Sequence, residues 1–176
     1  MTLRIEDLRS DGPYFDGAIA VYGEAFAEPP YSDPDRGEEI RARLLDTHAQ
    51  RPGFQAFVAL LGDSVVGMTY GYHGSPGQWW HDTVAKRLQR DVASKWLGDS
   101  YELVEIAVSP AHQGKGIGSA LIERLLRDRD EATCVLSTRT DSEAHRLYRR
   151  HGFEVIVEMA FVSRGALFFV MGKRLP

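Results

Sequence analysis

The segment at residues 112–126, "HQGKGIGSALIERLL", combines glycines with the start of a helix in a way that suits anion binding. Gly114, Gly116 and Gly118 stand where an apolar-periodic stretch begins, and that periodicity predicts a helix. Helix N-termini leave backbone N–H groups without intrahelical partners and carry partial positive charge. Glycines let an anion approach the backbone closely, and Lys115 adds a local donor. The segment therefore indicates a phosphate cradle; the alternative is a glycine-rich turn that only packs a helix against a strand.

Two well-known phosphate-binding patterns do not fit these glycines. A Walker A loop requires Gly-Lys followed by Ser or Thr, but Gly116 follows Gly114-Lys115. A dinucleotide fingerprint, G-x-G-x-x-G, would place Ser119 or Leu121 at its last glycine. An ATP-binding protein thus remains only as an alternative use of the cradle.

A third pattern, Q-x-x-G-x-G, is satisfied by Gln113, Gly116 and Gly118, directly after the strand-like "IAVSP". Here the chain resembles the GNAT superfamily of N-acetyltransferases. In that family this loop and helix start bind the pyrophosphate of acetyl-CoA. The resemblance implies the following contacts with acetyl-CoA from this region: Ile106, Ala107, Val108, Gln113, Gly114, Lys115, Gly116, Ile117, Gly118 and Ser119.

A second motif strengthens the resemblance. "DSEAHRLYRRHGF" is similar to the family's N-x-x-A-x-x-L-Y-x-x-x-G-F helix, and the two motifs together cover roughly residues 100–155. Asp141 stands where the family usually has Asn, which bears on a contact with the pantetheine arm of the coenzyme. The resemblance implies that Tyr148 contacts acetyl-CoA and protonates its departing sulfur. The alternative for Tyr148 is a packed aromatic ring on a partly buried helix face.

Acyl transfer from a thioester to an amine requires a deprotonated amine, because a free alkylammonium has a pKa of about 10. It also requires a donor for the developing oxyanion, which the resemblance assigns to the backbone N–H of Val108. Glu102 and Glu105 are the candidate bases on the strand "YELVEIAV". Glu102 lies an even number of residues before Val108, so a regular strand places both on one face and favours Glu102. A bulge would favour Glu105 instead, and water can also relay the proton.

For the acceptor we expect a primary amine of a small molecule. The loops "EPPYSD" and "GQWWHD" supply Glu28, Tyr31, Trp79 and Trp80, and aromatic rings with carboxylates suit a cationic amine. The alternative is that the tryptophans pack a helix onto the sheet and the acids only solvate a loop. The segment 74–99 is longer than a simple connection requires, and we expect it to form one wall of the acceptor pocket.

The elements that must position these residues follow from periodicity and from turn residues. We expect strands and helices in the order strand 2–8, helix 14–27, a helix from 33 to about 52, a hairpin over 54–73, helix 81–97, strand 101–108, a helix to about 127, strand 133–138, helix 141–151, and strands 153–162 and 166–175. This order predicts a single α+β domain, residues 1–176, with a GNAT-type mixed, mostly antiparallel sheet of about seven strands flanked by helices.

Length and composition narrow the class of protein. The chain has 176 residues, 43% hydrophobic and 26% charged, which suits one globular domain. It contains no apolar run of bilayer length and no secretory leader pattern, so we expect a cytoplasmic protein without a membrane partner. A net charge of −4 disfavours a nucleic-acid partner. The six histidines are scattered, so no metal site is expected, and the single Cys134 is read as a buried, inert thiol.

The sequence therefore predicts an acetyl-CoA-dependent N-acetyltransferase that works by direct attack of the amine. Three alternatives stay open: a protein or peptide acceptor in place of a small molecule, a non-catalytic acetyl-CoA-binding regulatory module, and a homodimer formed by pairing of the closing strands.

Overall fold

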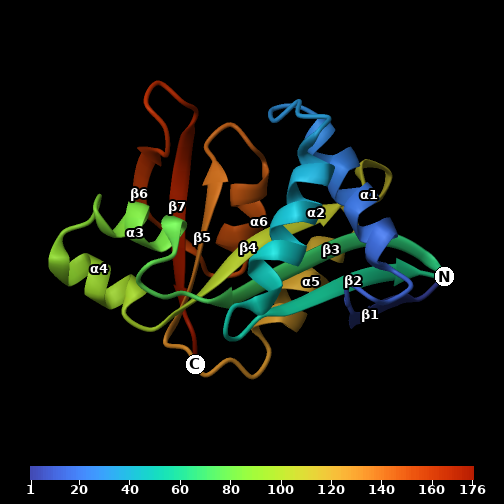
Figure 1. Ribbon diagram of the computed structural model, residues 1–176, viewed down its shortest axis with the longest axis horizontal. Helices are drawn as coiled ribbons and strands as arrows, with labels where there is room; N and C mark the ends of the chain where they lie inside the picture. Colours follow the sequence, from blue (N-terminus) through green and yellow to red (C-terminus); the bar gives the residue numbers. More distant parts are fainter. The chain divides into compact units, whose positions relative to one another are not determined.

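Seven strands form one sheet in the computed structural model, which describes residues 1–176. The strand order is β1-β2-β3-β4-β5-β7-β6 (Figure 1). β4 and β5 pair in parallel, whereas β1 with β2, β2 with β3, β5 with β7, and β6 with β7 pair antiparallel. The predicted mixed, mostly antiparallel sheet with flanking helices is confirmed. No helix combines the length and the apolar character that crossing a bilayer requires.

Contacts between residues divide the chain into two compact units. One contains residues 1–72 and 104–127, and the other contains residues 73–103 and 128–176. Strand β4, Ser100–Val108, contributes its second half to the first unit and its first half to the second.

The first unit holds three strands, three α-helices and the end of β4. Its other elements are β1 Leu3–Asp7, α1 Phe15–Ala27, α2 Arg36–Asp46, a 3₁₀ turn η1 His48–Gln50, β2 Gln55–Leu61, β3 Ser64–His73, a 3₁₀ turn η2 Pro110–His112, and α5 Ile117–Leu126. The other predicted elements in this part of the sequence match these bounds to within a few residues, but the helix predicted to end near residue 52 ends at Asp46, and a separate 3₁₀ turn follows it.

Side chains of β3 alternate between two helical layers in the first unit. Met68 and Tyr70 join the core formed with α1 and α2, whereas Gly67 faces α5, where Leu121 and Ile117 approach to within 3.0–3.2 Å of the position that a Cβ would take. This is the two-residue period of a strand with both faces covered. Figure 1 shows α1 and α2 on one side of these strands and α5 on the other.

The second unit holds the remaining helices and strands, together with the first half of β4. These are α3 Trp79–Ala85, α4 Arg90–Leu97, β5 Thr133–Arg139, α6 Ala144–Arg150, β6 Glu154–Ala160 and β7 Leu167–Arg174. Its core packs Val84 and Trp96 against Val135 and Val170. Cys134 is fully buried in β5 as expected, and burial raises the pKa of its thiol, which keeps it protonated.

The helix predicted over residues 81–97 is wrong as a single element. The structure ends α3 at Ala85 and begins α4 at Arg90, with Gln89 in extended backbone conformation between them. The apolar residues Val84, Leu88, Val92 and Trp96 are spaced four apart, and each such step rotates about 40° around a regular helix. A straight helix would spread the row over about 120°, so two short helices bury it better.

Candidate functional site

The glycine-rich loop before α5 exposes backbone rather than side chains. Gly114 and Gly116 adopt φ values of 75° and 84°, in the left-handed region that favours glycine. A Cβ on either residue would meet no atom within 4 Å, so the space above the loop is open. Gly116 precedes α5 and supplies no side-chain cap, and the first N–H bonded within the helix is that of Ala120, 3.1 Å from the Gly116 carbonyl oxygen. The first turn of α5 therefore begins, without a side-chain cap, next to this open space.

The loop is tied to the end of β4 by short hydrogen bonds. The Gln113 side-chain amide donates to the Val108 carbonyl at 3.1 Å. The Ser109 N–H donates to the Val66 carbonyl in β3 at 2.9 Å. Gln113, predicted from its motif position to contact the coenzyme, thus has a visible role in fixing the loop to the strand. Lys115 is exposed, with its ammonium 3.5 Å from the Ala111 carbonyl.

These features fit a diphosphate. Consecutive N–H groups at a helix N-terminus, left-handed glycines and a neighbouring lysine together favour a compact dianion over a neutral ligand. The alternative of a turn that serves only for packing accounts for Gly67, where α5 approaches β3 closely, but not for two glycines that face open space.

Glu105 is a buried carboxylate in the same unit. Its side chain is 8% exposed, and its carbonyl accepts a 2.8 Å hydrogen bond from the Thr69 hydroxyl. Burial raises the pKa of the Glu105 carboxyl, while the charge of Arg36 and a hydrogen bond from the Tyr22 hydroxyl partly oppose that rise. A carboxyl with a raised pKa in a dry site is suited to accepting a proton.

Arg36 occupies an aromatic cluster formed by α1 and the α1–α2 connection. Its guanidinium carbon lies 4.1 Å from the centre of the Phe26 ring and 5.1 Å from that of Tyr31. Its Nε donates to the Tyr22 hydroxyl at 2.9 Å. Tyr31 was expected to face a cationic acceptor; in the structure its ring faces this arginine of the chain itself.

Two buried tyrosines, Tyr70 and Tyr72, come from β3. The Tyr70 hydroxyl lies 2.7 Å from Nδ1 of His48 in η1, and Tyr72 accepts a hydrogen bond from Arg51. Burial, reinforced by the nearby arginines, lowers the pKa of His48 to about 4, so its imidazole is neutral at pH 7. Burial and the charge of Glu105 raise the pKa of the Tyr70 hydroxyl.

The candidate residues of the second unit lie in different surroundings. Tyr148 is 5% exposed in α6, with its ring edge-on to Phe153 at 5.9 Å between centroids. Asp141 forms a two-pronged ion pair with Arg139, at 3.0 and 2.8 Å. The hydrogen bond from Arg139 lowers the pKa of the Asp141 carboxyl.

Glu102 is 5% exposed and lies opposite Val135 in the parallel pairing of β4 with β5. Its charge contributes to the raised pKa of Cys134, after the larger effect of burial. The two candidate bases therefore differ in their neighbours: Glu102 lies beside the buried thiol of β5, whereas Glu105 lies beside hydroxyl and guanidinium groups of α1 and α2.

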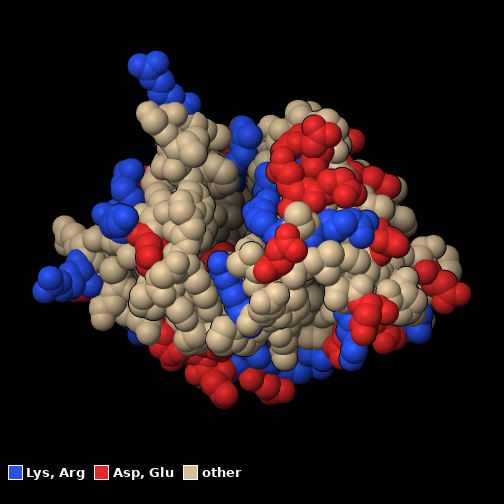
Figure 2. Space-filling view, in the orientation of Figure 1, with Lys and Arg blue, Asp and Glu red and all other residues tan.

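The remaining predicted acceptor residues differ in exposure. Trp79 is 63% exposed and packs against Phe161 at 5.8 Å. Trp80, expected to contact the acceptor, is half-buried and donates its indole N–H to the Ser137 hydroxyl at 3.0 Å. Glu28 is exposed at the end of α1. Figure 2 shows acidic side chains gathered around the α1–α2 connection and the start of α2, where Glu28, Asp35, Glu38 and Glu39 are exposed.

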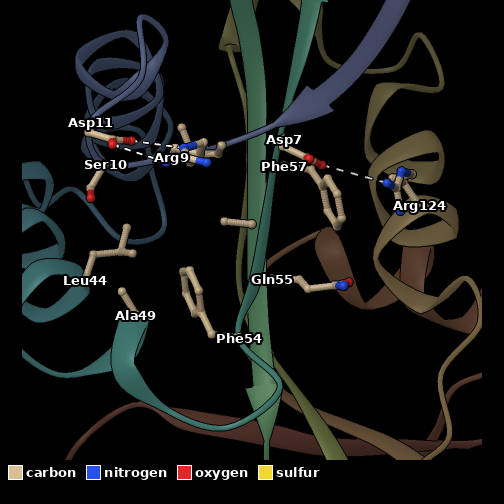
Figure 3. Close-up of a pocket in the computed structure, with 12 residues that line it drawn as sticks. Asp7, Arg9, Ser10, Asp11, Leu44, Ala49, Phe54, Gln55, Phe57 and Arg124 are labelled. Atoms are coloured by element: carbon tan, nitrogen blue, oxygen red, sulfur yellow. Dashed lines mark hydrogen bonds and ion pairs between the residues drawn. The ribbon is translucent and has the colours of Figure 1, made fainter.

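A separate pocket in the first unit is lined by the end of β1 and the segment after it, by residues between α2 and β2, and by Arg124 of α5 (Figure 3). Arg124 pairs with Asp7 at 3.8 Å, and Arg9 pairs with Asp11 at 3.0 Å. No residue predicted for the site lines this pocket.

Sequence reasoning missed Tyr22, Arg36, Tyr70 and His48. For the two tyrosines the local signal is a hydroxyl within a largely apolar element, such as Tyr70 two residues after Met68 on one face of β3. Arg36 and His48 lie in polar segments and carry no such signal. Tyr22 and Arg36 come from α1 and α2, which approach each other closely where Gly23 and Gly37 meet.

Comparisons with known proteins agree with this geometry. The sequence model of the GNAT acetyltransferase domain matches residues 52–155. A GCN5-like protein acetyltransferase of Mycobacterium tuberculosis is 34% identical, over 90% of each chain. Among solved structures, a histone acetyltransferase and related acetyltransferase of Corynebacterium glutamicum superposes with a TM-score of 0.67 at 22% identity, covering 98% of this chain and 96% of that one. The PaiA N-acetyltransferase of Thermoplasma acidophilum in complex with coenzyme A gives 0.65 at 15% identity, covering 99% and 100%.

Proposed function

Because the chain belongs to the GNAT acetyltransferase family, we propose that it moves an acetyl group from acetyl-CoA to a primary amine, with Glu105 as the general base. The observation that carries the proposal is the presence, in one unit, of an open anion cradle at the start of α5 and a buried carboxylate with a raised pKa on β4.

When bound, acetyl-CoA supplies an acetyl group already activated as a thioester. The N–H groups at the start of α5, together with Gly114 and Gly116, hold its diphosphate, and Lys115 adds positive charge. The Gln113 bond to Val108 fixes the loop against the strand whose last N–H we assign, from the family resemblance, as the oxyanion donor. These residues orient the thioester; they do not take part in proton transfer.

Glu105 accepts the proton that the acceptor ammonium must lose before its nitrogen forms the new N–C bond. A general base works best when its pKa lies near the working pH, because it then both accepts and releases a proton readily. The raised pKa of the Glu105 carboxyl moves it in that direction. Strand parity favours Glu102, but the surroundings favour Glu105, because Tyr22 and Arg36 stabilise its ionised form.

Tyr148 is the proposed acid that returns a proton to the coenzyme sulfur as the C–S bond breaks. Support for this role comes from its match to the family motif. The Asp141 ion pair with Arg139 favours a local turn role for Asp141 over a contact with the pantetheine arm.

Two acceptor classes stay in the proposal. A small primary amine requires, from the acceptor side of the site, only the Glu105 carboxylate as proton acceptor. A lysine or N-terminus of a protein is favoured by the likeness to a protein acetyltransferase that is 34% identical. It is also favoured by the acidic surface around the α1–α2 connection, which would attract a basic segment.

The test uses the purified protein with acetyl-CoA and two acceptor panels, one of small amines and one of basic peptides. The free thiol of the released coenzyme A is measured with a colorimetric thiol reagent, and the acetylated product is identified by mass spectrometry. Turnover on either panel supports the proposal and selects the acceptor class. Tight acetyl-CoA binding with no turnover on either panel, unchanged by Tyr148→Phe, favours the non-catalytic regulatory module.

The base is assigned by a matched pair, Glu105→Gln and Glu102→Gln, since both carboxylates are buried on the same strand. General-base removal typically costs a factor of 10²–10⁴ in rate, so we expect roughly that loss for Glu105→Gln. A loss of this size for Glu102→Gln, with little change for Glu105→Gln, would assign the role to Glu102.

A further inference from the structure

Three side chains from three elements form a chain of polar contacts in the first unit. Arg36 of α2 donates from Nε to the Tyr22 hydroxyl oxygen at 2.9 Å. Tyr22 of α1 in turn donates its hydroxyl hydrogen to the Glu105 carboxylate of β4. The Tyr22 side chain has no exposed surface, so water does not compete for this hydroxyl.

Stacking on aromatic rings holds the Arg36 guanidinium, the cation at one end of these polar contacts, in place. The guanidinium of Arg36 lies 4.1 Å from the centre of the Phe26 ring, and the Phe26 ring packs on Tyr22 at 4.4 Å and on Tyr31 at 4.6 Å. A planar guanidinium on an aromatic face presents Nε in a fixed direction, which a lysine ammonium cannot do.

The other charged and titratable groups around Glu105 come from neighbouring elements. α2 also contributes Arg43, whose charge favours the ionised carboxylate. β3 contributes Tyr70, which interacts with the Glu105 charge and contacts the neutral His48 of η1. Among these groups, Tyr22 is the one that both donates to the carboxylate and connects it to an arginine.

We propose that Tyr22, anchored by Arg36, is a positioning residue that orients the Glu105 carboxylate and stabilises its ionised form for proton acceptance. This inference rests on the proposed role of Glu105 as the general base. It gives the α1–α2 segment control over the ionisation of the base, in addition to its place near the expected acceptor.

The positioning role predicts the direction in which the pKa of Glu105 changes when the Tyr22 hydroxyl is removed. Tyr22→Phe removes the donor to the carboxylate, so the ionised form loses stabilisation and the pKa of Glu105 rises further. The acidic limb of the kcat/KM profile therefore moves to higher pH by about one unit, and activity recovers at alkaline pH. A purely structural role would lower the rate at every pH without moving the limb.

The experiment measures pH profiles of acetyl transfer for the wild type, Tyr22→Phe, Arg36→Gln, Arg36→Lys and Tyr14→Phe. Tyr14 is the matched control, because it precedes the same helix and packs against the same core. We expect the limb to shift upward for Tyr22→Phe and Arg36→Gln, to shift less for Arg36→Lys, and to stay in place for Tyr14→Phe. A ¹³C NMR titration of the Glu105 carboxyl in the wild type and Tyr22→Phe gives the same shift without requiring activity.

The two proposals fail in different ways. If Glu105→Gln abolishes turnover but Tyr22→Phe leaves both the limb and the carboxyl titration unchanged, the positioning role of Tyr22 is overturned and the base role stands. If Glu105→Gln keeps full activity and an unchanged profile, the base role fails, whatever the NMR titration shows. An equal limb shift in Tyr14→Phe would also overturn the proposal, since it would mean that any change at α1 has this effect.

Discussion

Substitution of Gly116 by alanine separates backbone strain from ligand binding. Gly116 has φ of 84° and open space where a Cβ would stand. The new methyl group therefore clashes with nothing in the protein, and the cost to folding is the left-handed strain of an L-residue, about 1 kcal/mol. For a chain of this length, that corresponds to a fall in Tm of roughly 2–4 °C.

The same methyl group would occupy the space above the cradle that we assign to the diphosphate. We expect Gly116→Ala to weaken acetyl-CoA binding by at least about tenfold, since a lost close approach of the backbone removes one or more charge-assisted hydrogen bonds. Isothermal titration calorimetry with acetyl-CoA measures the affinity, and thermal unfolding without ligand measures the strain.

Gly77→Ala is the matched control. Gly77 also has a positive φ, 97°, and no atom within 4 Å of an added Cβ, but it lies in the loop before α3. Its variant should show the same small loss of stability and unchanged affinity for acetyl-CoA. If the two variants bind acetyl-CoA equally well, the cradle does not hold the diphosphate and the transferase proposal loses its support.

Three further predictions follow from burial and packing. The free energy of unfolding of the wild type should fall as pH rises from the usual Glu pKa of 4.5 towards the raised pKa of Glu105, because the unfolded chain releases that proton first. Urea unfolding at several pH values measures this dependence, which should be weaker in Glu105→Gln. An equal dependence on pH in the two proteins would contradict a raised pKa at Glu105. His48, with a pKa lowered to about 4, should stay neutral in an NMR titration well below the ordinary value of 6.5, and its contribution to stability should be lost as pH falls through that window; a midpoint near 6.5 would refute its burial against Tyr70. Gly172→Ala should destabilise the protein by about 2–3 kcal/mol in urea unfolding, since its Cβ would stand 2.5 Å from the Trp96 ring; a change below 0.5 kcal/mol would mean that this packing relaxes freely.

Elements whose signals are local could be predicted from the sequence. The hairpin of β2 and β3 followed from two β-rich runs around Gly62-Asp63-Ser64, and the start of α5 followed from glycines before an apolar period. The helix over 81–97 failed because a four-residue apolar spacing is compatible with one helix or with two, and the choice depends on what the row packs against.

The base illustrates the same limit within a single strand. Parity along the sequence favoured Glu102, but parity carries no information about the neighbours that set a carboxyl pKa. Those neighbours, Tyr22 and Arg36, lie 83 and 69 positions before Glu105 and reach it only through helix packing.

The sequence by itself indicated the family, most of the element order and the glycine-rich loop before α5, because each depends on residues close together along the chain. Only the tertiary structure decided which carboxylate lies among the hydroxyl and guanidinium groups of α1 and α2, and that Tyr31 faces Arg36. The reason is physical: backbone periodicity and φ preferences act over a few residues, whereas desolvation and Coulomb interactions act through space between segments that the fold brings together.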